Sequence, residues 1–145
     1  MYVADYGLLR KDTGVMDKLF QNSEVYLVDT IHIPGYEMHS AGTYPIAIKS
    51  DLALSIVADI YSIYQYDSYN VTFTLDKFYG TPDYFERNSI KCTFKKYSCT
   101  LGTTECYIYT VGKSWAKVFP TIQSGDWYDN CYSLIGTKLV QKTTK

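Results

Sequence analysis

Histidine is nearly absent from this sequence, which holds only His32 and His39 among 145 residues. Nucleophilic catalysis by serine or cysteine usually needs a histidine base, so any such site would have to use one of these two. The sequence also lacks the Gly-x-Ser-x-Gly segment that presents a nucleophilic serine on a sharp turn, and it contains no cofactor-binding fingerprint. These absences predict a protein that is not an enzyme, with no catalytic residues and no cofactor.

An excess of charge of either sign is also lacking, because 14 Lys and Arg face 15 Asp and Glu and leave a net charge of −1. A duplex nucleic-acid binder needs a basic surface to displace counterions, and anionic membranes attract basic segments. No apolar run approaches the roughly 18 residues that cross a bilayer. Residues 1–6 lack the basic and apolar regions of a secretory signal. We therefore expect no duplex nucleic acid and no membrane as partner, and synthesis in the cytoplasm without a signal peptide.

None of the four cysteines shows the Cys-x-x-Cys spacing of a zinc or redox site. A hairpin with its turn at residues 101–104 would place Cys99 opposite Cys106, close enough for a disulfide. Such a bridge would indicate an exported or virion-borne protein. Without a signal peptide, the alternative of reduced cysteines acting as small apolar residues is favoured.

Two other groups of residues resemble ligand sites. Asp29, His32 and Glu37 could supply nitrogen and oxygen ligands to a metal, but strand alternation puts Asp29 and His32 on opposite faces. A polar loop after a strand is the better interpretation, and we expect no metal. Residues 112–114, Gly-Lys-Ser, resemble the end of a phosphate-binding loop, but the glycine required five positions earlier is Tyr107. We reject that site.

Tyrosine is the residue that the sequence holds in excess, with 16 copies in a chain that is 17% aromatic. Its ring and hydroxyl suit surfaces that are covered by a partner, and tyrosine is enriched in interfaces. It is also common in strands, so the rings could simply fill strand positions. The candidate interaction surface consists of Tyr61, Tyr64, Tyr66, Tyr69, Tyr97, Tyr107, Tyr109, Trp127 and Tyr128.

The hydrophobic pattern predicts a single α+β domain over residues 1–145, dominated by β-strands in antiparallel sheets. A short helix is expected at residues 14–21. A longer amphipathic helix is expected at residues 51–64, because its apolar residues recur at helical spacing, although a long buried strand is the alternative. The expected strands are 24–33, 43–49, 70–79, 90–100, 105–111, 115–119 and 132–140.

These features rank three hypotheses for function. The first is a non-enzymatic structural or assembly module whose partner is protein, either copies of itself in a homo-oligomer or a subunit of a larger assembly such as a virus or phage particle. The alternative is an aromatic surface that binds a glycan, a peptide or single-stranded nucleic acid. The third is a small hydrolase that uses Asp126 and Asp129 as a carboxylate pair, although aspartates beside a turn are more often solvated turn formers.

Overall fold

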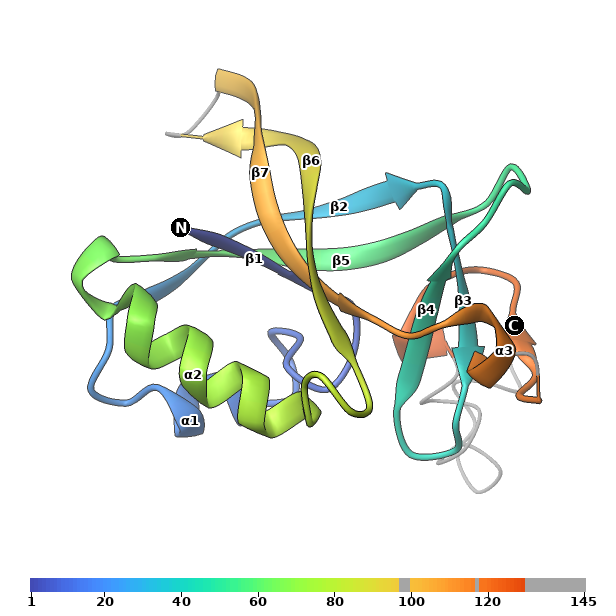
Figure 1. The fold of residues 1–145 in the computed structure, drawn as a ribbon. Helices are drawn as coiled ribbons and strands as arrows, with labels where there is room; N and C mark the ends of the chain where they lie inside the picture. Colours follow the sequence, from blue (N-terminus) through green and yellow to red (C-terminus); the bar gives the residue numbers. More distant parts are fainter. Residues whose placement is uncertain (97–99, 117, 130–145) are drawn as a thin grey trace.

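The computed structural model describes residues 1–96, 100–116 and 118–129, which form two β-sheets with short helices (Figure 1). The larger sheet has five strands in the order β2-β5-β1-β7-β6, with bounds Val25–Pro34, Ser55–Ile63, Tyr2–Asp5, Thr100–Thr110 and Glu86–Lys96. The smaller sheet has the order β4-β3-β8, with bounds Pro45–Lys49, Tyr36–Ser40 and Thr121–Ile122. Strand β1 pairs with β7 in parallel, and the other neighbouring strands pair antiparallel. The predicted α+β fold dominated by strands is confirmed.

Both faces of the larger sheet are covered. In β1, Val3 belongs to a buried cluster that includes Leu75 of α2 (Ser68–Tyr79). Its neighbour Ala4 points the other way and belongs to a second cluster, which includes Met38 of β3. Figure 1 shows α2 lying across one face of the larger sheet, and the smaller sheet lying beside one end of it. Both faces of the sheet at β1 are therefore packed against other residues of the core.

The predicted helix at residues 51–64 is wrong, because this segment contains strand β5. A strand that is buried on both faces has no polar side, so its apolar residues need not alternate. In β5, Ile56, Ile60 and Ile63 are buried, but so are most residues between them. The spacing that resembled one face of a helix is part of a continuous buried run.

The predicted strand at residues 70–79 is also wrong, because this segment lies within α2. Val71 and Leu75, four residues apart, are buried against the sheet, whereas Phe73 between them is exposed. That is the periodicity of a helix with one buried face. The helix ends at Gly80, whose φ of 67° is left-handed and whose amide bonds to the carbonyls of Asp76 and Lys77.

The remaining elements agree in part with the sequence. Helix α1 (Val15–Leu19) lies within the predicted 14–21, and β2 and β4 match the strands expected at 24–33 and 43–49. The strand expected at 115–119 is wrong at its start, because Trp115 and Ala116 lie in α3 (Lys113–Ala116). The carbonyl of Gly112 accepts from the amides of these two residues at 3.2 and 3.3 Å. The strand expected at 132–140 lies outside the described residues.

Strands β6 and β7 form the predicted hairpin, but its register differs from the predicted one. Strand β7 begins at Thr100, so residues 101–104 are part of a strand and not a turn. Cys106 pairs with Ile90 in the register, which excludes Cys99 as its cross-strand partner. Cys99 itself lies outside the described residues. Cys92 and Cys106 are buried, and neither belongs to a disulfide.

None of the helices in the described ranges is long and apolar enough to span a bilayer.

Candidate functional site

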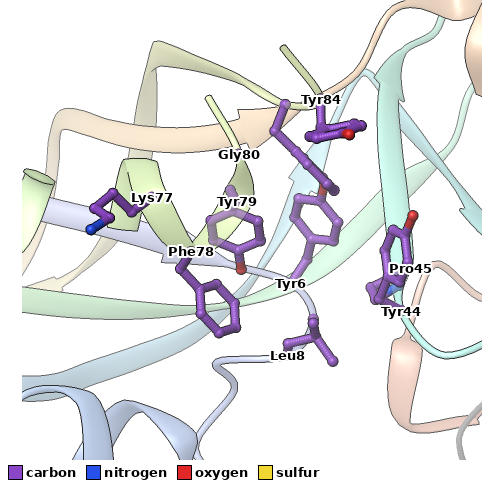
Figure 2. A pocket seen from close by; sticks show the side chains of 11 residues that line it. Tyr6, Leu8, Tyr44, Pro45, Lys77, Phe78, Tyr79, Gly80 and Tyr84 are labelled. Atoms are coloured by element: carbon purple, nitrogen blue, oxygen red, sulfur yellow. The ribbon is translucent and has the colours of Figure 1, made fainter. Parts of the chain in front are cut away.

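A cavity of about 560 Å³ opens where β1 ends, beside the start of β4 and the end of α2 (Figure 2). Its volume is in the usual range for a small-molecule site, about 300–1,000 Å³. We call it the tyrosine pocket, and it is lined by Tyr6, Gly7, Leu8, Tyr44, Pro45, Lys77, Phe78, Tyr79, Gly80, Tyr84 and Phe85. Most of this surface is aromatic or aliphatic.

The loop that follows β1 forms one wall of the tyrosine pocket and is held tightly. A Cβ atom on Gly7 would lie 2.5 Å from Cγ of Pro45, so only glycine lets the loop approach β4 this closely. The hydroxyl of Tyr6 donates to the carbonyl of Tyr109 at 2.6 Å and accepts from the amide of Ala47 at 3.1 Å. These contacts fix the loop between β7 and β4.

Behind the pocket wall lies a buried carboxylate, that of Asp5, which is 2% exposed. Its Oδ1 accepts from the amides of Gly7 and Leu9 at 2.9 and 3.1 Å. Its Oδ2 accepts from the hydroxyl of Tyr79, a side chain that lines the pocket. Burial raises the pKa of Asp5 above its ordinary value, although these three hydrogen bonds oppose the rise. Burial and the neighbouring Asp5 also raise the pKa of Tyr79 well above its ordinary value.

A second buried carboxylate, that of Asp59, lies in β5 at the position paired with Asp5. Nε of Arg10 lies 3.3 Å from its Oδ2, and this guanidinium balances its charge. The amide of Lys11 donates to Oδ2 at 2.8 Å, and the hydroxyl of Thr30 donates to Oδ1 at 2.7 Å. Asp59 is therefore fully occupied by structural contacts, whereas Asp5 has a direct link to the pocket through Tyr79.

The carboxylates singled out from the sequence do not line the tyrosine pocket. Asp126 is bound to Arg10, with Nη1 2.8 Å from its Oδ1, and Asp129 follows it in a short turn. Glu37 accepts from Ser50 at 2.9 Å and lies 3.0 Å from Nε2 of His39. Within the part of the chain that the structure describes, no group of His, Cys, Asp and Glu could hold a metal ion.

The predicted interaction surface is divided between the core and the exterior. Tyr61, Tyr109 and Trp127 are buried, so they cannot form part of an exposed contact surface. Tyr128 is half-buried under the guanidinium of Arg10, and Tyr107 is half-buried near Arg87. Tyr97 lies outside the described residues.

The exposed members of that surface are Tyr64, Tyr66 and Tyr69, around the start of α2. Whether they contact a partner stays a prediction.

The pocket residues are not among the candidates that the sequence indicates. No helix or strand is expected at Asp5 and Tyr6, and Tyr79 falls within the strand expected at 70–79. One signal was present: Gly80 followed by Pro82 is typical of a helix end, which would have placed residues 77–80 at the C-terminus of a helix.

Structures of known proteins share this fold. An uncharacterised protein from Pyrococcus horikoshii superposes with a TM-score of 0.58 and 14% identity, covering 92% of this chain and 94% of its own. An AIG2-like protein from mouse gives a TM-score of 0.63 and 13% identity, covering 86% and 87%. The Escherichia coli protein YtfP gives 0.60 and 21% identity, covering 90% and 99%. Comparison with curated protein sequences finds no match.

The family model described as "Gamma-glutamyl cyclotransferase, AIG2-like" matches residues 3–129, which include every segment of the pocket wall. Since this is a family of enzymes, the prediction of a non-enzymatic structural module was wrong, and so was that of a virus or phage component. That prediction was based on the scarcity of histidine and the lack of a cofactor motif. This chain belongs to the γ-glutamyl cyclotransferase, AIG2-like family.

Proposed function

We propose that this protein cyclises the γ-glutamyl group of a small γ-glutamyl amide in the tyrosine pocket, releasing 5-oxoproline and a free amine. The observation that carries the proposal is the family match over residues 3–129, which includes both the loop after β1 and the end of α2 that enclose the cavity. The reaction needs no oxidant, metal or cofactor. It joins the α-amine of the substrate to its own γ-carbonyl carbon and expels the amine that this carbonyl carried.

The pocket suits a substrate with both apolar and charged parts. Its aromatic walls can hold the ring-closing γ-glutamyl chain in a folded form, and orientation of two reacting groups is itself a large part of catalysis. Lys77 is the only side chain with a formal charge on the described wall of the pocket. Its ammonium lies 5.7 Å from the centroid of the Phe73 ring and points away from the cavity in Figure 2, so the side chain must turn inward to attract the substrate's α-carboxylate.

The loop after β1 offers a hydrogen-bond donor on the same wall. The amides of Gly7 and Leu9 are bound to Asp5. The amide of Leu8 between them has no acceptor within the described ranges. A main-chain amide fixed at a pocket wall can stabilise negative charge as it develops on an attacked carbonyl oxygen.

Turnover of a defined substrate tests the proposal. Purified protein is incubated with γ-glutamyl-n-butylamide and, separately, with its α-linked isomer, and the loss of each compound is followed by chromatography. The γ-linked compound should be consumed and the isomer should persist, because its amide carbonyl is not positioned for closure of a five-membered ring. Persistence of both compounds would contradict the proposal.

A pair of variants locates the reaction. Leu8→Trp fills the cavity and should lower kcat/KM at least ~10-fold, since a few kcal/mol of lost positioning corresponds to such factors. Leu52→Trp makes the same chemical change at an exposed loop residue away from the pocket and is the control. Equal activity of the two variants would place the reaction elsewhere.

A further inference from the structure

The tyrosine pocket lacks an obvious base. No carboxylate and no imidazole belongs to its described lining, in which the ionisable side chains are Lys77 and tyrosines. Cyclisation nevertheless requires one, because the attacking α-amine must lose a proton and the leaving amine must gain one. The proton acceptor must therefore be reached through one of the side chains on the wall.

The geometry points to Tyr79 and Asp5 as a proton relay, in which the hydroxyl of Tyr79 exchanges protons with the substrate and Asp5 holds the proton between the two halves of the reaction. This inference rests on the proposed function. Tyr79 is the pocket-lining tyrosine whose hydroxyl donates directly to a buried carboxylate. Figure 2 shows its ring extending from the end of α2 with the hydroxyl toward the loop that carries Leu8.

The relay removes one proton from the substrate and returns it to the leaving group. The nitrogen of the α-amine bonds to the γ-carbonyl carbon, its proton passes to the oxygen of Tyr79, and the proton of Tyr79 passes to Oδ2 of Asp5. The bond from that carbon to the leaving nitrogen then breaks. The proton returns from Asp5 through Tyr79 to the leaving nitrogen. Both side chains end as they began, and the products are a five-membered lactam and a neutral amine.

The surroundings of the two residues suit this role. The ring of Tyr79 stacks on that of Tyr109, with centroids 4.5 Å apart and planes 20° apart, so the hydroxyl is held in place. The groups that face Asp5 are Tyr79 from α2, Asp59 from β5, and the amides of Gly7 and Leu9 from its own loop. Burial and the charge of Asp59 raise the pKa of Asp5 above its ordinary value, so its carboxylate accepts a proton more readily than an exposed one.

The kinetic test compares Tyr79→Phe with Tyr69→Phe, using γ-glutamyl-n-butylamide as the substrate. Tyr79→Phe keeps the stacked ring and removes only the hydroxyl, so kcat should fall about 100- to 10,000-fold with little change in KM. Tyr69→Phe removes a hydroxyl from the same helix at a residue that is 80% exposed, and should behave as the parent. In the parent, kcat should rise with pH through the raised pKa of Asp5. An unchanged kcat in Tyr79→Phe would overturn the relay.

A titration without substrate tests the pair independently of activity. The carboxyl carbons of protein labelled with ¹³C-aspartate are followed by NMR against pH, and the signal lost in Asp5→Asn identifies Asp5. The hydrogen bond from Tyr79 favours the ionised carboxylate, so Tyr79→Phe should raise the pKa of Asp5 further. An unaltered Asp5 titration would refute the coupling.

Failure of the proposed function is distinguishable from failure of the relay. If the parent consumes the γ-glutamyl amide and Tyr79→Phe does so equally well, the function stands and the relay is wrong. If the parent consumes no γ-glutamyl amide, the proposed function is wrong. The relay is then wrong for that reaction as well, even if the titration shows that Tyr79 and Asp5 are coupled.

Discussion

Asp5 and Asp59 occupy paired positions on neighbouring strands, yet their surroundings give them different roles. Asp59 has a guanidinium, a hydroxyl and a main-chain amide around it. Within the described residues Asp5 has no cation among its partners, and two amides and a phenol are its donors. When two buried carboxyl groups lie side by side, such differences in their partners give them different proton affinities. In this account Asp59 has a structural role, and Asp5 accepts the proton in the proposed relay.

The structural role of Arg10 can be measured by Arg10→Met, which keeps the aliphatic stem and removes the cation. Asp59 is 0% exposed and would lose the charge that balances it, so the free energy of unfolding should fall by about 3–5 kcal/mol. The control is Arg87→Met. The Arg87–Asp76 pair is partly exposed, with side chains 31% and 29% accessible, so its loss should change stability by about 0–1 kcal/mol. Urea unfolding measures both, and equal losses would contradict the assignment.

The raised pKa of Asp5 predicts a pH dependence of stability. Between the pKa of an unfolded aspartate and the higher pKa in the folded state, the folded protein holds a proton that the unfolded chain has released. The stabilisation that comes from protonated Asp5 is therefore present at low pH and is lost as pH rises through that interval.

Asp5→Asn cannot ionise and removes this dependence. The free energy of unfolding of the variant, minus that of the parent, should increase as pH rises above the ordinary aspartate pKa and then level off. Urea unfolding of both proteins at a series of pH values gives this difference. The contributions of other titrating groups such as Glu37 are the same in both proteins and cancel. A flat or falling difference would show that burial does not raise the pKa of Asp5.

At the scale of elements, the sequence predicts a helix where the structure has strand β5 and a strand where it has helix α2. Each segment is rich in β-branched and aromatic residues, and local pattern alone could not separate them. What decides is burial: β5 is the second strand from the edge and is covered on both faces, whereas α2 buries little more than Val71 and Leu75. Tertiary packing of this kind is not visible in a window of ten residues.

The contact between β5 and the turn at Gly125 can be tested by substitution. Gly125 has a φ of 68°, its carbonyl accepts from Val57 at 2.8 Å, and a Cβ atom on it would lie 2.0 Å from the carbonyl oxygen of Ser55. Gly125→Ala should therefore lower the free energy of unfolding, both through backbone strain and by forcing the turn away from β5.

Gly14→Ala is the matched control for that substitution. Gly14 has a similar φ of 76°, but a Cβ atom there meets nothing within 4 Å. Its replacement should cost about 1–2 kcal/mol, the strain of a left-handed alanine. Gly125→Ala should exceed this value in urea unfolding, and similar values for the two variants would mean that the turn can move without loss.

For the molecule as a whole, the hydrophobic pattern was sufficient to predict an α+β fold dominated by strands, because the class depends on most segments together and not on the assignment of any single one. The site could not be predicted, since its residues come from segments around 5–8, 44–45 and 77–85 that only the topology brings together. The scarcity of histidine and the lack of a cofactor motif led to the prediction of a protein that is not an enzyme, and the family match overturns that prediction. A buried aspartate behind a tyrosine leaves no sequence motif.

Self-association stays a prediction at this scale. Tyr69 and Phe73 lie four residues apart on α2 and are 80% and 57% exposed, and Tyr66, just before the helix, is 75% exposed. Exposed apolar surface of this kind often contacts a partner. Light scattering at several protein concentrations should give a mass above that of the 16.6 kDa monomer, and Tyr69→Lys should lower it. A constant monomer mass would contradict self-association and would leave the proposed reaction unaffected.

The most direct measurement of the central claim is the identity of the products formed in H₂¹⁸O. The parent protein is incubated with γ-glutamyl-n-butylamide, and the products are quantified by mass spectrometry. Cyclisation uses no water, so the account predicts 5-oxoproline without ¹⁸O, in equal amount to butylamine. Glutamate carrying ¹⁸O would show hydrolysis instead, and the absence of both products would show that the tyrosine pocket does not perform this reaction.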